Sequence, residues 1–127
     1  MFAIDLKSRK SISEQIIDQM KEMIVTGVME TGEKVPSVRE LAGELTVNPN
    51  TVQKAYRALE QQGYLFTAQG RGTFVADPGE IVVSREEVNR AKTMIRDGLD
   101  QLYYLGVSRA EATELIGQLM EKREDWK

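Results

Sequence analysis

Residues 34–75 read KVPSVRELAGELTVNPNTVQKAYRALEQQGYLFTAQGRGTFV, and this stretch decides the fold. It contains Ser37-Val-Arg-Glu40, a capping box, in which a hydroxyl and a carboxylate each accept a bond from a free backbone N–H at a helix start. A short helix is expected from there to about Leu45. Residues 46–48 make a turn, and Pro49 fits the first position of a second helix, where its missing N–H is harmless. Two amphipathic helices joined by such a short turn are typical of a helix-turn-helix.

The second helix, expected from residue 49 to about 62, has two different faces. Its apolar side chains recur at the spacing of one helix face: Val52, Ala55, Tyr56 and Leu59. Its polar side chains recur at the same spacing on another face: Asn50, Gln53, Lys54 and Arg57. Amides and guanidinium groups pair with base edges in the major groove, and cations pair with phosphates. The helix is therefore expected to use one face for the core and the other for an anionic, hydrogen-bonding partner.

A hairpin should follow this helix. Residues 64–67 and 73–76 are rich in β-forming residues and are separated by Ala-Gln-Gly-Arg-Gly. The glycines allow close approach to a neighbouring surface, with Arg71 directed outward between them. The alternative is that the glycines only turn the chain and that Arg71 is solvated. With the preceding helices, the hairpin predicts a winged helix-turn-helix in a mainly α fold.

Composition limits the classes of function. The chain has 127 residues, 41% hydrophobic and 29% charged, which is typical of a globular protein. No apolar run approaches the about 18 residues of a membrane helix, and the start lacks the apolar segment of a secretory signal. We therefore expect a cytoplasmic protein. The sequence has no Cys and no His, which removes thiol and imidazole chemistry and the usual zinc sites. Carboxylates alone could still act as acid and base or bind magnesium, but here they recur among lysines and arginines at helical spacing, which is typical of a solvated face. We therefore expect no catalytic site, no metal site and no cofactor.

The net charge of −3 is unusual for a DNA-binding chain, but the charges are unevenly distributed. Residues 34–75 hold five basic and three acidic side chains, a net charge of +2. Residues 77–127 hold eight basic and eleven acidic side chains. The basic footprint is local and modest, so binding is expected to need two copies acting together.

Helices are also expected on both sides of the central stretch. Phe2 to Ile4 could form a small strand, and the capping box at Ser11-Ile-Ser-Glu14 opens a helix to about Gly27. Two more capping boxes, at Ser84 and Ser108, open helices expected at residues 85–105 and 109–124. The break in composition at Asp77-Pro-Gly79 separates a domain at residues 1–76 from a two-helix region at residues 80–127.

The C-terminal helices should form an antiparallel pair, because only a few residues join them. Two helices enclose little volume, so they cannot bury both of their apolar stripes within the pair. Homodimerisation through residues 85–124 is favoured, since two-fold dimers are the commonest soluble assembly. The alternative is that the pair folds back on the domain at residues 1–76.

The motifs in series closely resemble the GntR family of bacterial transcription regulators. The resemblance covers about residues 12–76 and rests on EKVPSVRELA at 33–42, VNPNTV at 47–52, and GRGTFV at 70–75. The short two-helix C-terminal region is similar to the YtrA-type subfamily, whose members dimerise through those helices. The resemblance implies a dimeric, repressor-like protein on a two-fold operator of double-stranded DNA.

The resemblance also implies which residues contact DNA. These are Arg39, Asn50, Thr51, Gln53, Lys54, Tyr56, Arg57, Gly70 and Arg71. Tyr56 matches a family position whose ring packs inward and whose hydroxyl can reach a phosphate. In one place the chain departs from its relatives, because Ser11-Ile-Ser13 stands where they commonly have Pro-Ile-Tyr.

Other functions remain open at this level. A winged-helix adaptor would use the same helix to bind a protein, although a polar, cationic face differs from the aromatic and aliphatic anchors of protein interfaces. A small enzyme is the third class. The sequence has no pocket signature, so whether an unknown small-molecule effector binds is also open.

Overall fold

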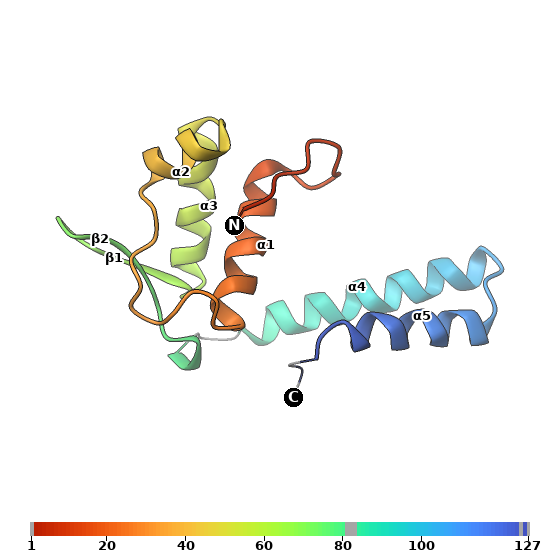
Figure 1. Ribbon diagram of the computed structural model, residues 1–127. Coiled ribbons are helices and arrows are strands. Elements are labelled where there is room, and N and C mark those ends of the chain that lie inside the picture. The colour runs from red at the N-terminus through yellow and green to blue at the C-terminus, as the bar shows by residue number, and fades with distance from the viewer. Residues whose placement is uncertain (1, 81–83, 125, 127) are drawn as a thin grey trace. The chain divides into compact units, whose positions relative to one another are not determined.

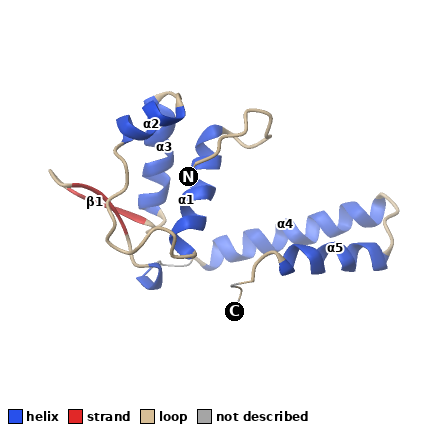
Figure 2. Cartoon of the chain, in the orientation of Figure 1, coloured by secondary structure: helices blue, strands red, loops and turns tan. Residues whose placement is uncertain are grey.

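The computed structural model describes residues 2–80, 84–124 and 126, and it divides the chain into two compact units, Met1–Val82 and Val83–Lys127. The described elements are α1 (Ile12–Val25), α2 (Val38–Leu45), α3 (Pro49–Gln61), β1 (Leu65–Ala68), β2 (Gly72–Val75), a 3-10 turn η1 (Pro78–Glu80), α4 (Arg85–Tyr104) and α5 (Arg109–Glu121). Figure 1 shows their course and Figure 2 their helical or strand character. The prediction of a mainly α fold with a small β-hairpin is confirmed.

Side-chain caps start the helices where the sequence indicates. The Ser37 hydroxyl accepts a bond from the Glu40 backbone N–H, and the Glu40 carboxylate accepts one from the Ser37 N–H, both at 3.1 Å. This is the complete capping box. At Ser11, Ser84 and Ser108 the structure shows the hydroxyl half of the predicted box.

The ends of several elements differ from the prediction by a few residues. The first helix ends at Val25 rather than near Gly27, because Thr26 caps it and its hydroxyl donates to the Glu22 carbonyl at 2.6 Å. The last helix ends at Glu121 rather than near residue 124. The two strands of the hairpin each begin and end one residue away from the expected positions. Helix ends fray, so shifts of this size leave the order of elements unchanged.

The core of the first unit lies between its three helices and the base of the hairpin. The apolar stripes predicted for α1, α2 and α3 supply most of it, and Leu65 and Val75 close it from β1 and β2. Its members are Ile16, Met20, Met23, Ile24, Met29, Val35, Leu41, Ala42, Val52, Ala55, Tyr56, Leu59, Leu65 and Val75. The helix-turn-helix is therefore held by packing of every apolar stripe in this unit against the others.

The N-terminal segment is not a strand, which corrects the prediction for Phe2 to Ile4. Two side-chain amides of α1 take the place of a neighbouring strand. Gln19 accepts from the Ala3 N–H at 2.9 Å and donates to the Ala3 carbonyl at 2.7 Å. The Gln15 side chain likewise accepts from the Asp5 N–H at 2.8 Å and donates to the Asp5 carbonyl at 2.9 Å. The backbone groups of this segment are thus paired without a sheet.

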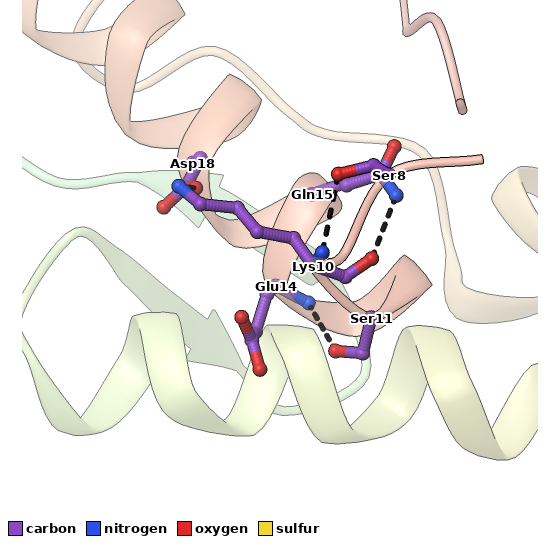
Figure 3. A network of polar contacts seen from close by, with 6 residues as sticks. All are labelled: Ser8, Lys10, Ser11, Glu14, Gln15 and Asp18. Carbon is purple, nitrogen blue, oxygen red and sulfur yellow. Dashed lines mark hydrogen bonds and ion pairs between the residues drawn. The ribbon is translucent and has the colours of Figure 1, made fainter. Parts of the chain in front are cut away.

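Gln15 also ties down the loop that follows this segment. Its amide donates to the Lys10 carbonyl at 3.0 Å, and the Lys10 ammonium lies 2.5 Å from an Asp18 carboxylate oxygen. Figure 3 shows these side chains together with the Ser11 cap of Glu14. The loop is therefore anchored to the first two turns of α1.

A third extended segment pairs with the hairpin, and the sequence did not predict it. Three backbone bonds make the pairing. The Gly32 N–H donates to the Val75 carbonyl at 2.8 Å, and the Val75 N–H donates to the Glu33 carbonyl at 2.9 Å. The Val35 N–H donates to the Thr73 carbonyl at 2.9 Å. Lys34 lies opposite Phe74 as an antiparallel bridge. We call residues 32–35 and 65–75 together the wing. In Figure 1 the chain leading to α2 runs beside β2.

The second unit consists of α4 and α5, which contact each other. Neither helix has a buried residue. Many of their large apolar side chains are exposed: Val88, Met94, Ile95, Leu99, Tyr103, Tyr104, Leu115, Leu119 and Met120. Among the described residues, no helix is long and apolar enough to cross a membrane.

Candidate nucleic-acid interface

The turn between α2 and α3 fixes the direction of the second helix. Thr46 caps α2 in the left-handed conformation, at φ 56° and ψ 48°, which is uncommon for a residue with a branched side chain. The Val47 N–H donates to the Ala42 carbonyl at 3.0 Å, and the Asn48 side chain accepts from the Asn50 N–H at 2.8 Å. The free groups at both helix ends are thus paired, as a tight turn requires.

The two faces predicted for α3 are separated by burial. Val52, Ala55, Tyr56 and Leu59 are buried, with exposed fractions between 0% and 2%. The polar set Asn50, Gln53, Lys54 and Arg57 is exposed, and Thr51 is half-buried beside it. In the described part of the chain, neither Lys54 nor Arg57 is in an ion pair. The exposed face therefore presents two amides and two free cations.

Arg39 lies in the first turn of α2, where it is exposed. The neighbouring acid, Glu40, is occupied as part of the capping box. Bonds from the Ser37 N–H and the Ser37 hydroxyl, with a smaller contribution from Lys34, hold the pKa of the Glu40 carboxyl below its usual value. The acid that follows Arg39 in the sequence is thus tied to the helix start, in line with the favourable position of an anion at a helix N-terminus.

Tyr56 has a hydrogen-bond partner within its own chain. Its ring packs inward as expected, with 2% of the residue exposed, but its hydroxyl donates to the Pro36 carbonyl at 2.6 Å. A tyrosine hydroxyl has a single proton, so this bond leaves none to donate to a phosphate. Burial, and to a smaller extent Glu40 and Glu44, raises the pKa of this hydroxyl well above its usual range. Tyr56 ties α3 to the segment before α2, and it positions the helix.

The tip of the wing carries Gly70, Arg71 and Gly72. Arg71 is exposed, and its N–H donates to the Ala68 carbonyl at 2.9 Å, which closes the turn. Gly70 and Gly72 have φ of 79° and 124°, values that side chains rarely tolerate. The predicted pair of glycines around an outward arginine is thus present in the folded chain.

A contact that the sequence analysis missed joins the wing to α3. The Thr67 hydroxyl on β1 donates to the Glu60 carboxylate near the end of α3, and it lies 3.3 Å from the Thr73 hydroxyl on β2. This chain of polar groups helps to fix the angle between α3 and the hairpin. No local pattern in the sequence indicates it, because Glu60 and Thr67 lie in different elements.

The concave surfaces of the second unit are small and open. One groove of about 310 Å³ lies between α4 and α5 and is lined by Leu102, Val107, Glu111, Ala112, Glu114, Leu115 and Gln118. Small-molecule sites usually have volumes from about 300 Å³ upward. The volume of this groove is therefore at the lower limit for a small-molecule effector site.

A helix-turn-helix whose second helix exposes amides and cations, followed by a wing with an arginine tip, defines a winged helix-turn-helix protein of the DNA-binding class. The gntR family of bacterial regulatory proteins matches residues 12–75. The chain belongs to this family of transcription regulators, as its motifs indicated.

Individual relatives agree with this assignment. The HTH-type transcriptional repressor YtrA of Bacillus subtilis (strain 168) is 42% identical over 94% of this chain and 92% of its own length. The crystal structure of a transcriptional antiterminator from Listeria monocytogenes EGD-e has a TM-score of 0.84 at 40% identity, over 94% of this chain and 90% of that one. YtrA from Sulfolobus acidocaldarius, a GntR-family transcription factor, has a TM-score of 0.62 at 37% identity, over 78% of this chain and 97% of that one. The resemblance to the YtrA type thus extends into the C-terminal helices.

Proposed function

We propose that this protein is a sequence-specific transcriptional repressor that binds a two-fold symmetric DNA operator as a homodimer. The observation that carries the proposal is the division of α3 into a buried apolar face and an exposed face with two amides and two cations, neither of which forms an ion pair with a described residue. A repressor acts on the chromosome, so a cytoplasmic location follows from the same proposal.

Each exposed group has a role suited to its chemistry. Asn50 and Gln53 pair with base edges in the major groove, and Thr51 bonds the backbone or a base beside them. Lys54 and Arg57 bind phosphates or guanine, and Arg39 binds a phosphate at the start of α2. Gly70 and Arg71 place the tip of the wing against the minor groove or the adjacent backbone.

The second unit supports the homodimer. Ile95 is 60% exposed and Leu99 41% exposed, although they share the apolar stripe of α4. Exposed apolar surface of this kind is typical of an interface. A second copy offers a matching surface and would hold two α3 helices at a fixed spacing. One copy has only a modest basic footprint. Two linked copies bind far more tightly than one, because the second binding event is then intramolecular.

Footprinting on the DNA upstream of the protein's own gene tests the function. We expect protection of two half-sites related by a two-fold axis, with centres one or more helical turns of about 34 Å apart. Absence of protection there and on genomic DNA fragments would contradict the proposal. Binding of a protein partner that is insensitive to salt, without retention of DNA, would instead support the winged-helix adaptor.

Light scattering tests the dimer. The substitution Ile95→Glu adds a charge to the apolar stripe and should convert a dimer into a monomer. Thr93→Glu is the matched control, because Thr93 is also exposed but lies on the opposite side of α4 at the helical period of about 3.6 residues. A monomeric parent, or an Ile95→Glu variant that remains dimeric, would refute dimerisation through this stripe.

A further inference from the structure

The side chain of Lys34 lies across the wing toward its tip. Lys34 is opposite Phe74 in the antiparallel pairing, so Gly72 is its diagonal neighbour, within reach of a long side chain. A Cβ atom placed on Gly72 would lie 2.6 Å from Lys34 Cε and 3.4 Å from its Nζ. With any other residue at position 72, the Lys34 side chain would have to leave this path. The ammonium is thus brought beside Gly72, which directly follows Arg71.

The Lys34 ammonium is also free to bind an anion. Lys34 is exposed, and the ion pair recorded among the described residues joins Lys10 and Asp18 instead. The carboxylate of the acidic residue Glu40 accepts a bond from the Ser37 N–H, and the charge of Lys34 only contributes to lowering its pKa, without an ion pair between the two among the described residues. An unpaired, exposed cation beside the tip of the wing suits a phosphate of the DNA backbone.

We propose that Lys34 is a phosphate-binding residue of the wing, which acts with Arg71 and is absent from the set implied by the helix-turn-helix motifs. This inference rests on the proposed DNA-binding function. It assigns the segment before α2 a second role: residues 32–35 complete the sheet of the wing, and they also deliver a cation to it. Each chain then presents two cations at the wing, which offsets part of the shortage of basic residues in the protein.

Salt-dependent binding of Lys34→Gln tests the proposal. Glutamine keeps much of the side-chain length over Gly72 and removes the charge. Affinity is measured by fluorescence anisotropy, from about 50 to 200 mM salt, for a labelled duplex that contains the footprinted sequence and for a scrambled duplex of equal length. Loss of one phosphate contact should reduce the slope of log K against log salt by about 0.9 per bound chain. Both duplexes should weaken by similar factors, because a phosphate contact carries no sequence information.

Lys21→Gln is the matched control. It makes the same change of charge in the same unit, but the Lys21 ammonium lies 5.3 Å from the centre of the Tyr64 ring, at the base of the wing rather than at its tip. The slope of log K against log salt for Lys21→Gln should equal that of the parent. Lys34→Arg should restore the slope, since it keeps the positive charge. Circular dichroism confirms that each variant is folded.

The outcomes separate the two proposals. Suppose that the parent binds DNA. If the salt slope of Lys34→Gln equals that of the parent, the role of Lys34 alone is overturned. The same holds if the salt slope of Lys34→Arg is as low as that of Lys34→Gln. A slope that falls as much in Lys21→Gln would also overturn it, because the effect would then be general to any lost charge. No binding of either duplex by the parent would overturn both proposals.

Discussion

Replacing Tyr56 by Phe tests whether this residue positions α3 or contacts DNA. The substitution removes the bond of 2.6 Å from the hydroxyl to the Pro36 carbonyl and keeps the buried ring. A hydrogen bond of this kind contributes about 0.5–1.5 kcal/mol net, and a carbonyl left unpaired adds to the loss. We therefore expect Tyr56→Phe to lower the free energy of unfolding by about 1–2 kcal/mol.

The pH dependence of stability should change as well. Burial raises the pKa of the Tyr56 hydroxyl, so the folded protein holds this proton at a pH where the unfolded chain, with a tyrosine pKa of about 10, releases it. The stability from Tyr56 is complete below about pH 10 and falls as the pH rises above it, by at most about 1.4 kcal/mol per pH unit. This part of the alkaline loss should be absent from Tyr56→Phe.

Chemical denaturation at pH 7, and at several values above about pH 10, measures both effects at one protein concentration, because a dimer links stability to concentration. Tyr104→Phe is the control: Tyr104 is 82% exposed and lies on the side of α4 opposite Ile95, so its substitution should leave the free energy of unfolding nearly unchanged. DNA affinity and its salt slope should be parental in folded Tyr56→Phe. A normal stability with a reduced salt slope would refute the structural role and restore a phosphate contact by Tyr56.

Two further substitutions test the ends of α2. Ser37→Ala removes the hydroxyl that accepts from the Glu40 N–H and should lower the free energy of unfolding by about 1 kcal/mol, as measured by denaturation. It should also raise the pKa of the Glu40 carboxyl partway toward its ordinary value, which an NMR titration can follow; an unchanged pKa would contradict the assigned cause. Thr46→Asn should stabilise the protein by about 0.5–1 kcal/mol, because asparagine tolerates the left-handed conformation that Thr46 adopts at φ 56°. Loss of stability in this variant would show that Thr46 is not strained.

Local signals in the sequence were sufficient to place the elements. A cap such as Ser37 acts on a backbone group three residues away, and an apolar stripe repeats within two turns of one helix. The helix-turn-helix, the hairpin with Arg71 at its tip and the two C-terminal helices follow from such short-range patterns. The separation of α3 into an apolar and a polar face could also be predicted, because burial then follows the period of the helix.

Only the tertiary structure decided how distant groups meet. The Tyr56 hydroxyl bonds a carbonyl 20 residues earlier, and the Gln19 amide pairs with backbone 16 residues before it. The third segment of the wing and the path of Lys34 over Gly72 likewise join parts of the chain that no periodicity connects. A polar side chain with several available partners takes the one that packing brings within about 3 Å. For Tyr56 that partner was a carbonyl of its own chain, and its position could not be known before the helices were packed.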